Sequence, residues 1–162
     1  MDSIKFYEID EKYITYLSDF APHLFWNKNP EQQFKRKYIG IVFQIDGYDY
    51  FAPLSSFKQK HRVMKDNIDF IKIKNYAVIN LNNMFPVPEK TRKYIDIGSQ
   101  SDSKYRALLL AEYRYIKSIQ EKIRKNAQAL YKIKIKDGNS TSLAKRCNDF
   151  KALEKACDKY KK

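Results

Sequence analysis

The chain has 162 residues, of which 43% are hydrophobic and 15% aromatic, and its formal net charge is +13. This length suits one domain with a hydrophobic core, and the aromatic content argues against a disordered chain. No run approaches the roughly 18 apolar residues of a membrane-spanning helix, and residues 1–6 lack a signal-peptide layout, so we expect a cytoplasmic protein. The positive charge favours a polyanionic partner: nucleic acid first, an anionic membrane surface second.

The first half of the sequence predicts strands, with one short helix and one long loop between them. Alternating or β-branched residues predict strands at 4–9, 38–45, 48–54, 69–74, 76–81 and 94–97. Asp46-Gly47 is typical of a tight turn that joins two strands as a hairpin. Asp10 suits the N-cap of a helix over 11–18, while residues 21–33 predict a long loop. The prolines within 82–89 predict irregular structure there.

The second half of the sequence predicts helices. Apolar residues from Tyr105 to Leu130 follow a spacing of three and four over about seven turns, which indicates one long helix that ends before Asp137-Gly138-Asn139. A second helix is expected over 141–159. Early strands and late helices, without alternation between them, predict an α+β fold in a single domain over 1–162. Its core would be a twisted antiparallel β-sheet with helices packed on it, including two long C-terminal helices.

The cysteine, histidine and glycine content excludes several classes of site. Cys147 and Cys157 would lie about 15 Å apart in the last helix, too far for a disulfide bond, so we expect reduced, half-buried thiols. The sequence has no Cys/His pair with the spacing of metal ligands and no glycine-rich phosphate loop. We therefore expect no metal ion and no other cofactor.

The stretch from Tyr50 to His61 combines the groups that suit a phosphate. Its predicted strand is followed by two serines, two lysines and the second of only two histidines, and no acidic residue lies between Tyr50 and Lys65. RNA cleavage by attack of a 2′-hydroxyl needs proton removal, stabilisation of charge on the phosphate oxygens and protonation of the leaving oxygen. Lysine can supply the charge, and neighbouring cations can lower its pKa enough for proton transfer. Ordinary loop residues remain the alternative, and His61 could be a general acid or a surface phosphate contact.

Basic residues elsewhere could contact an RNA backbone. One group precedes the strand at Tyr38 and is bracketed by aromatic residues, which adds a stacking option. A second group lies in the predicted long helix, where only Glu121 opposes it; a merely solvated helix face is the alternative. The predicted RNA contacts are Lys35, Arg36, Lys37, Lys60, Arg62, Lys65, Lys117, Lys122, Arg124 and Lys125.

Several sequence blocks occur in an order typical of one family. They are Ile4 to Tyr7, Tyr38 to Val42, Tyr50 to His61, Val78 to Val87, and Cys147 to Glu154. Together they resemble the bacterial endoribonuclease toxins of type III toxin–antitoxin systems, the ToxN/AbiQ-like family. The resemblance implies a strongly twisted antiparallel sheet and metal-independent, sequence-selective RNA cleavage that leaves a 2′,3′-cyclic phosphate and a 5′-hydroxyl. It also implies cellular or phage mRNA substrates, a role in phage abortive infection, and a small repeat RNA antitoxin. That RNA is often pseudoknotted, is processed by the toxin and inhibits it within a closed toxin–RNA assembly.

The resemblance also carries over to individual positions. The family's hydroxyl-Ser-x-Lys segment falls on Ser55, Ser56 and Lys58, and its trailing histidine falls on His61, while Phe57 stands where the family often has proline. These matches imply that Ser56 and Lys58 act at the reacting phosphate, with Ser55 and His61 as supporting contacts. The competing hypotheses are a non-catalytic basic RNA-binding module and, ranked last, a peripheral membrane protein.

Overall fold

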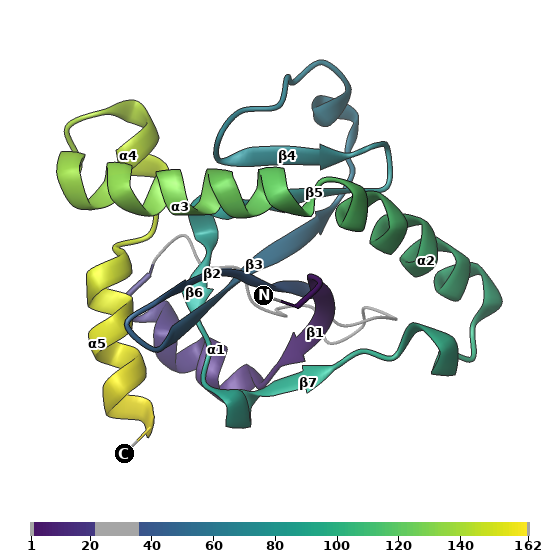
Figure 1. Ribbon diagram of the computed structural model, residues 1–162, viewed down its shortest axis with the longest axis horizontal. Coiled ribbons are helices and arrows are strands. Elements are labelled where there is room, and N and C mark those ends of the chain that lie inside the picture. Colours follow the sequence, from purple (N-terminus) through teal and green to yellow (C-terminus); the bar gives the residue numbers. More distant parts are fainter. Residues whose placement is uncertain (1, 22–35, 162) are drawn as a thin grey trace.

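A computed structural model describes residues 2–21 and 36–161, and in these segments the chain forms a seven-stranded β-sheet (Figure 1). The strands are β1 (Lys5–Ile9), β2 (Tyr38–Ile45), β3 (Tyr48–Ser56), β4 (Phe70–Ile73), β5 (Ala77–Asn80), β6 (Phe85–Pro86) and β7 (Arg92–Tyr94). The strand order is β4-β5-β3-β2-β1-β7, with β6 also paired to β3. Every pairing is antiparallel, which confirms the predicted α+β class and its sheet.

Helices cover this sheet and enclose two hydrophobic clusters. The α-helices are α1 (Glu11–Ser18), α2 (Ser103–Ser118), α3 (Gln120–Asp137), α4 (Ser142–Arg146) and α5 (Phe150–Lys161). Short 3₁₀ turns lie at η1 (Gln59–Arg62), η2 (Leu81–Asn83), η3 (Glu89–Thr91) and η4 (Ile97–Ser99). One cluster joins the sheet to α2 and α3, and the other joins it to α1 and α5. Successive strand residues such as Phe51 and Ala52 enter different clusters, because side chains alternate along a strand.

Two local predictions are confirmed in detail. The Asp10 side chain accepts a hydrogen bond from the Lys12 N–H (3.0 Å), so it caps α1 as expected. At the β2–β3 turn, Asp46 and Gly47 both have positive φ, 50° and 83°. A two-residue turn of this kind matches the twist of the strands that it joins.

The predicted long helix is instead two helices, α2 and α3, which meet at an angle at Ile119 (Figure 1). Ile119 leaves the helical conformation, with φ −118° and ψ 15°. The apolar spacing continues through Ile116 and Ile123, both buried on the same cluster. Periodicity alone therefore could not reveal the bend.

The predicted last helix is also wrong in its bounds, because α4 and α5 are separated by residues 147–149. Asn148 explains the gap. Its backbone N–H donates to the Asn82 carbonyl (2.9 Å), and its side-chain Nδ2 donates to the Met84 carbonyl (3.1 Å). These long-range bonds hold the segment out of helical geometry.

The two cysteines and the last strand also differ from expectation. Cys147 and Cys157 are free, as predicted, but both are buried rather than half-buried. Cys147 ends α4 and Cys157 lies in α5, so they do not share a helix. The edge strand predicted at 94–97 is β7 at Arg92–Tyr94, where it pairs with β1. In the described segments, no helix has both the length and the apolar character needed to cross a bilayer.

Candidate active site

The two candidate serines lie within a strand rather than in the loop that the sequence predicted. β3 extends to Ser56, and Ser55 and Ser56 pair with Val78 and Ala77 of β5. Because side chains alternate along a strand, the two hydroxyls point to opposite faces of the sheet. Ser55 is half-buried and Ser56 is exposed. The structure therefore gives these serines different surroundings.

The Ser55 hydroxyl is held by two donors from outside its own strand. Arg36 Nη1 donates to Ser55 Oγ (3.3 Å) and to the Leu54 carbonyl (3.1 Å), and Asn80 Nδ2 donates to Ser55 Oγ (3.0 Å). A hydroxyl oxygen accepts two hydrogen bonds and donates one, so this oxygen is saturated as an acceptor while its hydrogen is available to an anion. Burial lowers the pKa of Arg36.

His61 is buried, and it fixes the backbone at Lys58. The Lys58 N–H donates to His61 Nδ1 (2.7 Å), and the His61 N–H donates to the Lys58 carbonyl (2.9 Å). The imidazole is 5% exposed and lies 5.5 Å from the Phe57 ring and 5.6 Å from the Phe70 ring. This burial contradicts the expectation of a surface phosphate contact: the histidine positions the loop that carries Lys58. The Phe57 ring packs against this imidazole from within the same loop.

The acceptor role requires a neutral imidazole, because a protonated ring has no lone pair at Nδ1. Burial lowers the pKa of His61, and the nearby charges of Lys60, Lys58 and Lys72 lower it further. The basic surroundings that suit a phosphate therefore also keep His61 in the form that its hydrogen bond needs.

Exposed cations surround this end of β3. Lys58, Lys60, Arg62 and Lys65 are all exposed on η1 and the residues beside it. Backbone bonds at Lys58 and His61 fix the turn, while the long side chains extend into solvent. A phosphate placed at this end of β3 would meet positive charge from several of these side chains.

Other predicted RNA contacts are already engaged within the protein. Lys37 is 14% exposed, and its Nζ lies 2.7 Å from Oε1 of the buried Glu112. Its ammonium also lies over the Phe6 and Tyr105 rings, at 5.7 and 5.4 Å from their centres. Lys37 therefore anchors the start of β2, directly after Arg36, rather than reaching into solvent.

The remaining predicted contacts divide by exposure. Arg124 is half-buried and donates to the carbonyls of Ile41 and Asp2, and Lys122 pairs with Asp66 (3.5 Å). Lys117 and Lys125 are exposed on α2 and α3. Lys35 lies outside the described residues.

Sequence reasoning missed two residues of this region, Asn80 and Glu112. Asn80 ends β5 opposite β3, and its position inside a block that resembles the family was the available signal. Glu112 is an acid in a helix rich in cations, but nothing local showed that it is buried against Lys37. Among residues 2–21 and 36–161, no group of three His, Cys, Asp or Glu side chains is arranged to hold a metal ion.

The sequence of the chain matches a known family over nearly its whole length. The family model described as toxin ToxN, type III toxin–antitoxin system, matches residues 5–158. The endoribonuclease ToxN of Bacillus thuringiensis subsp. kurstaki is 33% identical, over 99% of this chain and 86% of its own length. The endoribonuclease ToxN of Pectobacterium atrosepticum is 31% identical, over 78% of this chain and 79% of its own. The endoribonuclease AbiQ of Lactococcus lactis subsp. lactis is 26% identical over 99% of this chain and 91% of its own.

Solved structures agree with this match. A solved structure described with a processed non-coding RNA that regulates a bacterial antiviral system superposes with a TM-score of 0.86 and 28% identity, over 98% of this chain and 99% of that one. A type III toxin inhibited by a non-coding RNA pseudoknot superposes with a TM-score of 0.80 and 29% identity, over 99% of both chains. The chain therefore belongs to the ToxN family of type III toxin–antitoxin toxins, a family of endoribonucleases.

Proposed function

We propose that the whole chain acts as one sequence-selective, metal-independent endoribonuclease domain whose active site lies at the end of β3. The observation that carries the proposal is the exposure of Ser56 and Lys58 beside a Ser55 hydroxyl that Arg36 and Asn80 hold in place. In this reaction the 2′-hydroxyl gives up its proton to solvent and its oxygen forms a bond to the adjacent phosphorus. The bond from phosphorus to the 5′-oxygen breaks, and that oxygen takes up a proton from solvent. The products are a 2′,3′-cyclic phosphate and a 5′-hydroxyl.

Each residue of the site has a role that its surroundings support. Lys58 places a cation at the non-bridging oxygens, where charge grows in the transition state. The exposed Ser56 orients the reacting 2′-hydroxyl and relays its proton. Ser55, whose hydroxyl faces the other side of the sheet, supports the end of β3 through its bonds to Arg36 and Asn80, and His61 fixes the Lys58 backbone. A few polar groups raise the reaction rate strongly only when they are held in position before the substrate binds.

The partner that we propose is a small repeat RNA antitoxin, with a pseudoknot fold, that this toxin processes and that inhibits it. Two structural relatives are described with a regulatory non-coding RNA, one of them a pseudoknot. The net charge of +13 and the exposed lysines of this chain suit such a polyanion. The toxin and this RNA form a closed assembly in the cytoplasm. Toxin that is released from the assembly cuts cellular or phage mRNA.

The product ends test the reaction directly. Purified protein is incubated with RNA in excess EDTA, and the fragments are analysed by mass spectrometry. We expect cleavage at a preferred sequence, with 2′,3′-cyclic phosphate and 5′-hydroxyl ends. Fragments with 5′-phosphate ends, or cleavage abolished by EDTA and restored by a metal ion, would contradict the mechanism. RNA that is bound with steep salt dependence and stays intact would favour the non-catalytic RNA-binding module instead.

A further inference from the structure

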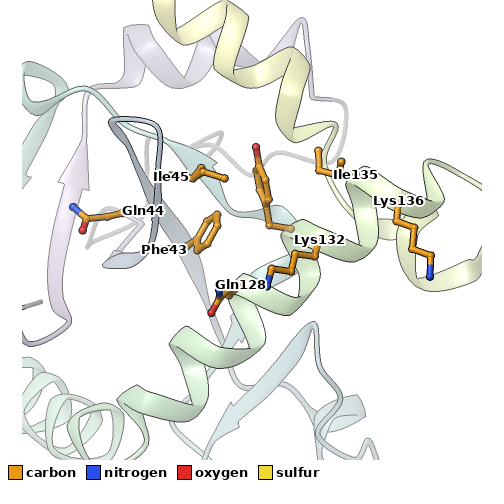
Figure 2. Close-up of a pocket in the computed structure, with 8 residues that line it drawn as sticks. Phe43, Gln44, Ile45, Gln128, Lys132, Ile135 and Lys136 are labelled. Atoms are coloured by element: carbon orange, nitrogen blue, oxygen red, sulfur yellow. The ribbon is translucent and has the colours of Figure 1, made fainter.

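An apolar pocket of about 460 Å³ lies between the β2–β3 hairpin and α3 (Figure 2). Its lining residues are Phe43, Gln44, Ile45, Gln128, Tyr131, Lys132, Ile135 and Lys136. Phe43 pairs with Tyr50, six residues before Ser56 in β3. At about 3.3 Å per residue, the pocket therefore lies roughly 20 Å from the candidate active site, toward the opposite end of the strand.

The floor of the pocket is aromatic and rigid. The Phe43 and Tyr131 rings lie 5.0 Å apart, and Tyr131 stacks on Phe150 with ring centres 5.6 Å apart. The Tyr131 hydroxyl donates to the Glu154 carboxylate (2.8 Å), which fixes the ring. Ile135 adds an apolar wall and is 48% exposed, although a large aliphatic side chain normally gains from burial.

The rim of the pocket is polar and positively charged. Gln44 and Gln128 supply amide groups, Lys132 and Lys136 supply ammonium groups, and none of the described residues that line the pocket is acidic. Lys125, Lys132 and Lys136 lie along one face of α3 because they are separated by seven and four residues. None of these three lysines forms an ion pair with a described residue. In Figure 2 the Phe43 ring points toward α3, with Gln128 and Lys132 beside each other on that helix.

We propose that this pocket holds one unpaired base of the antitoxin RNA, with its phosphates along the lysine face of α3; the inference rests on the proposed function. A base offers a flat apolar face for the aromatic floor and hydrogen-bonding edges for the two amides. The adjoining phosphates match the unpaired lysines in charge. An RNA that occupies both this pocket and the active site must span roughly 20 Å, so it extends well beyond one scissile phosphate. We therefore assign the pocket to the inhibitory RNA and not to the bond being cut.

The experiment measures inhibition by an RNA that cannot be cut. The inhibitor is a single-stranded 2′-O-methyl RNA of 16 nucleotides. The substrate is a tetranucleotide cut at its central phosphate, so that neither half is long enough to reach the pocket from the active site. Ile135→Glu places a negative charge in the pocket at an exposed helix position, so the fold tolerates it. We expect the inhibitory concentration to rise about tenfold or more while kcat/KM for the tetranucleotide stays unchanged.

Leu110→Glu is the matched control, because Leu110 is a 38% exposed aliphatic residue on α2, outside the pocket, and the charge change is the same. The inference is overturned if the inhibitory concentration rises equally in Leu110→Glu, or if it does not rise in Ile135→Glu. A fall in tetranucleotide cleavage in Ile135→Glu also overturns it, because the pocket would then serve the substrate. The third contrary result is a dimer in light scattering that Ile135→Glu dissociates without any change in RNA inhibition. If the wild-type protein leaves the tetranucleotide and longer RNA intact, the proposed function itself fails, whatever the pocket binds.

Discussion

The two ends of β3 place positive charge beside very different surroundings. At the end that carries Ser56, hydrogen bonds from Arg36, Asn80 and His61 fix a hydroxyl and a backbone segment. At the hairpin end, Lys125, Lys132 and Lys136 of α3 form no ion pair with a described residue, and the last two line an apolar, aromatic pocket. Catalysis needs groups held at fixed positions, whereas binding of an unpaired strand needs a stacking surface and charge. The difference supports the proposed chemistry at the first end and the proposed RNA retention at the second.

The two adjacent serines offer a large expected effect at the first end. Ser56→Ala removes the exposed hydroxyl, and we expect kcat/KM for RNA to fall about a hundredfold or more. Ser55→Ala removes the acceptor that Arg36 and Asn80 share on the other face of the sheet, so the expected loss is about tenfold. Cleavage rates of both variants, with circular dichroism to verify folding, measure the contrast. Equal losses of kcat/KM would contradict the different roles given to the two serines, and a larger loss in Ser55→Ala would reverse them.

The buried ion pair between Lys37 and Glu112 tests whether the first end depends on a rigid anchor. Lys37→Met leaves the Glu112 carboxylate buried without its partner, and we expect a loss of about 3 kcal/mol in the free energy of unfolding. Lys122→Met breaks the exposed pair with Asp66 and is expected to cost at most about 1 kcal/mol. Urea unfolding of both variants gives the comparison. Similar losses would mean that the buried pair is not an anchor.

His61 makes the stability of the first end depend on pH. Its pKa is lowered from the ordinary 6.5 in the folded protein, so the unfolded chain takes up the proton first as the pH falls. The stability that His61 contributes is therefore full above pH 6.5 and declines as the pH falls below that value.

Two substitutions separate the hydrogen bond of His61 from its titration. His61→Leu removes the acceptor from the Lys58 N–H and is expected to cost about 1–3 kcal/mol of stability as well as activity. His61→Asn can keep an acceptor oxygen near the Nδ1 position without titrating in this range. Melting temperatures from pH 5 to 8 should decline less steeply toward acid in His61→Asn than in the wild type. An identical decline of melting temperature toward acid in the two proteins would show that the titration of His61 does not affect stability.

The smallest expected effect lies at the hairpin end. Lys132→Gln removes one phosphate contact, so we expect the slope of log affinity against log salt for single-stranded RNA to fall by about one unit. Cleavage of a tetranucleotide should not change. Fluorescence anisotropy at several salt concentrations measures the slope, and an unchanged slope would place the RNA away from α3.

A feature of the fold could be predicted from the sequence only where neighbouring residues determine it. The hairpin turn at Asp46-Gly47 and the Asp10 cap were predictable because neighbouring residues determine them. The bend at Ile119 was not, because its apolar spacing matches that of a straight helix. The gap at Asn148 was not either, because its hydrogen-bond partners lie more than 60 residues away.

The candidate site shows the same limit. The segment from Ser55 to His61 stood out by composition and by family resemblance. Its geometry did not, because His61 is buried against Phe70 of another strand and Ser55 is held by Asn80 of β5. A histidine among lysines looks exposed in a sequence, and only the fold shows which aromatic rings cover it.

The most direct test of the central claim is the single-turnover cleavage rate of Lys58→Ala, compared with Lys155→Ala, which removes an exposed lysine of α5 far along the chain from the site. The account predicts that Lys58→Ala lowers the rate about a hundredfold to a thousandfold at saturating protein, while Lys155→Ala cuts RNA like the wild type. A Lys58→Ala protein that is folded and cuts RNA at the wild-type rate would contradict the placement of the active site at the end of β3.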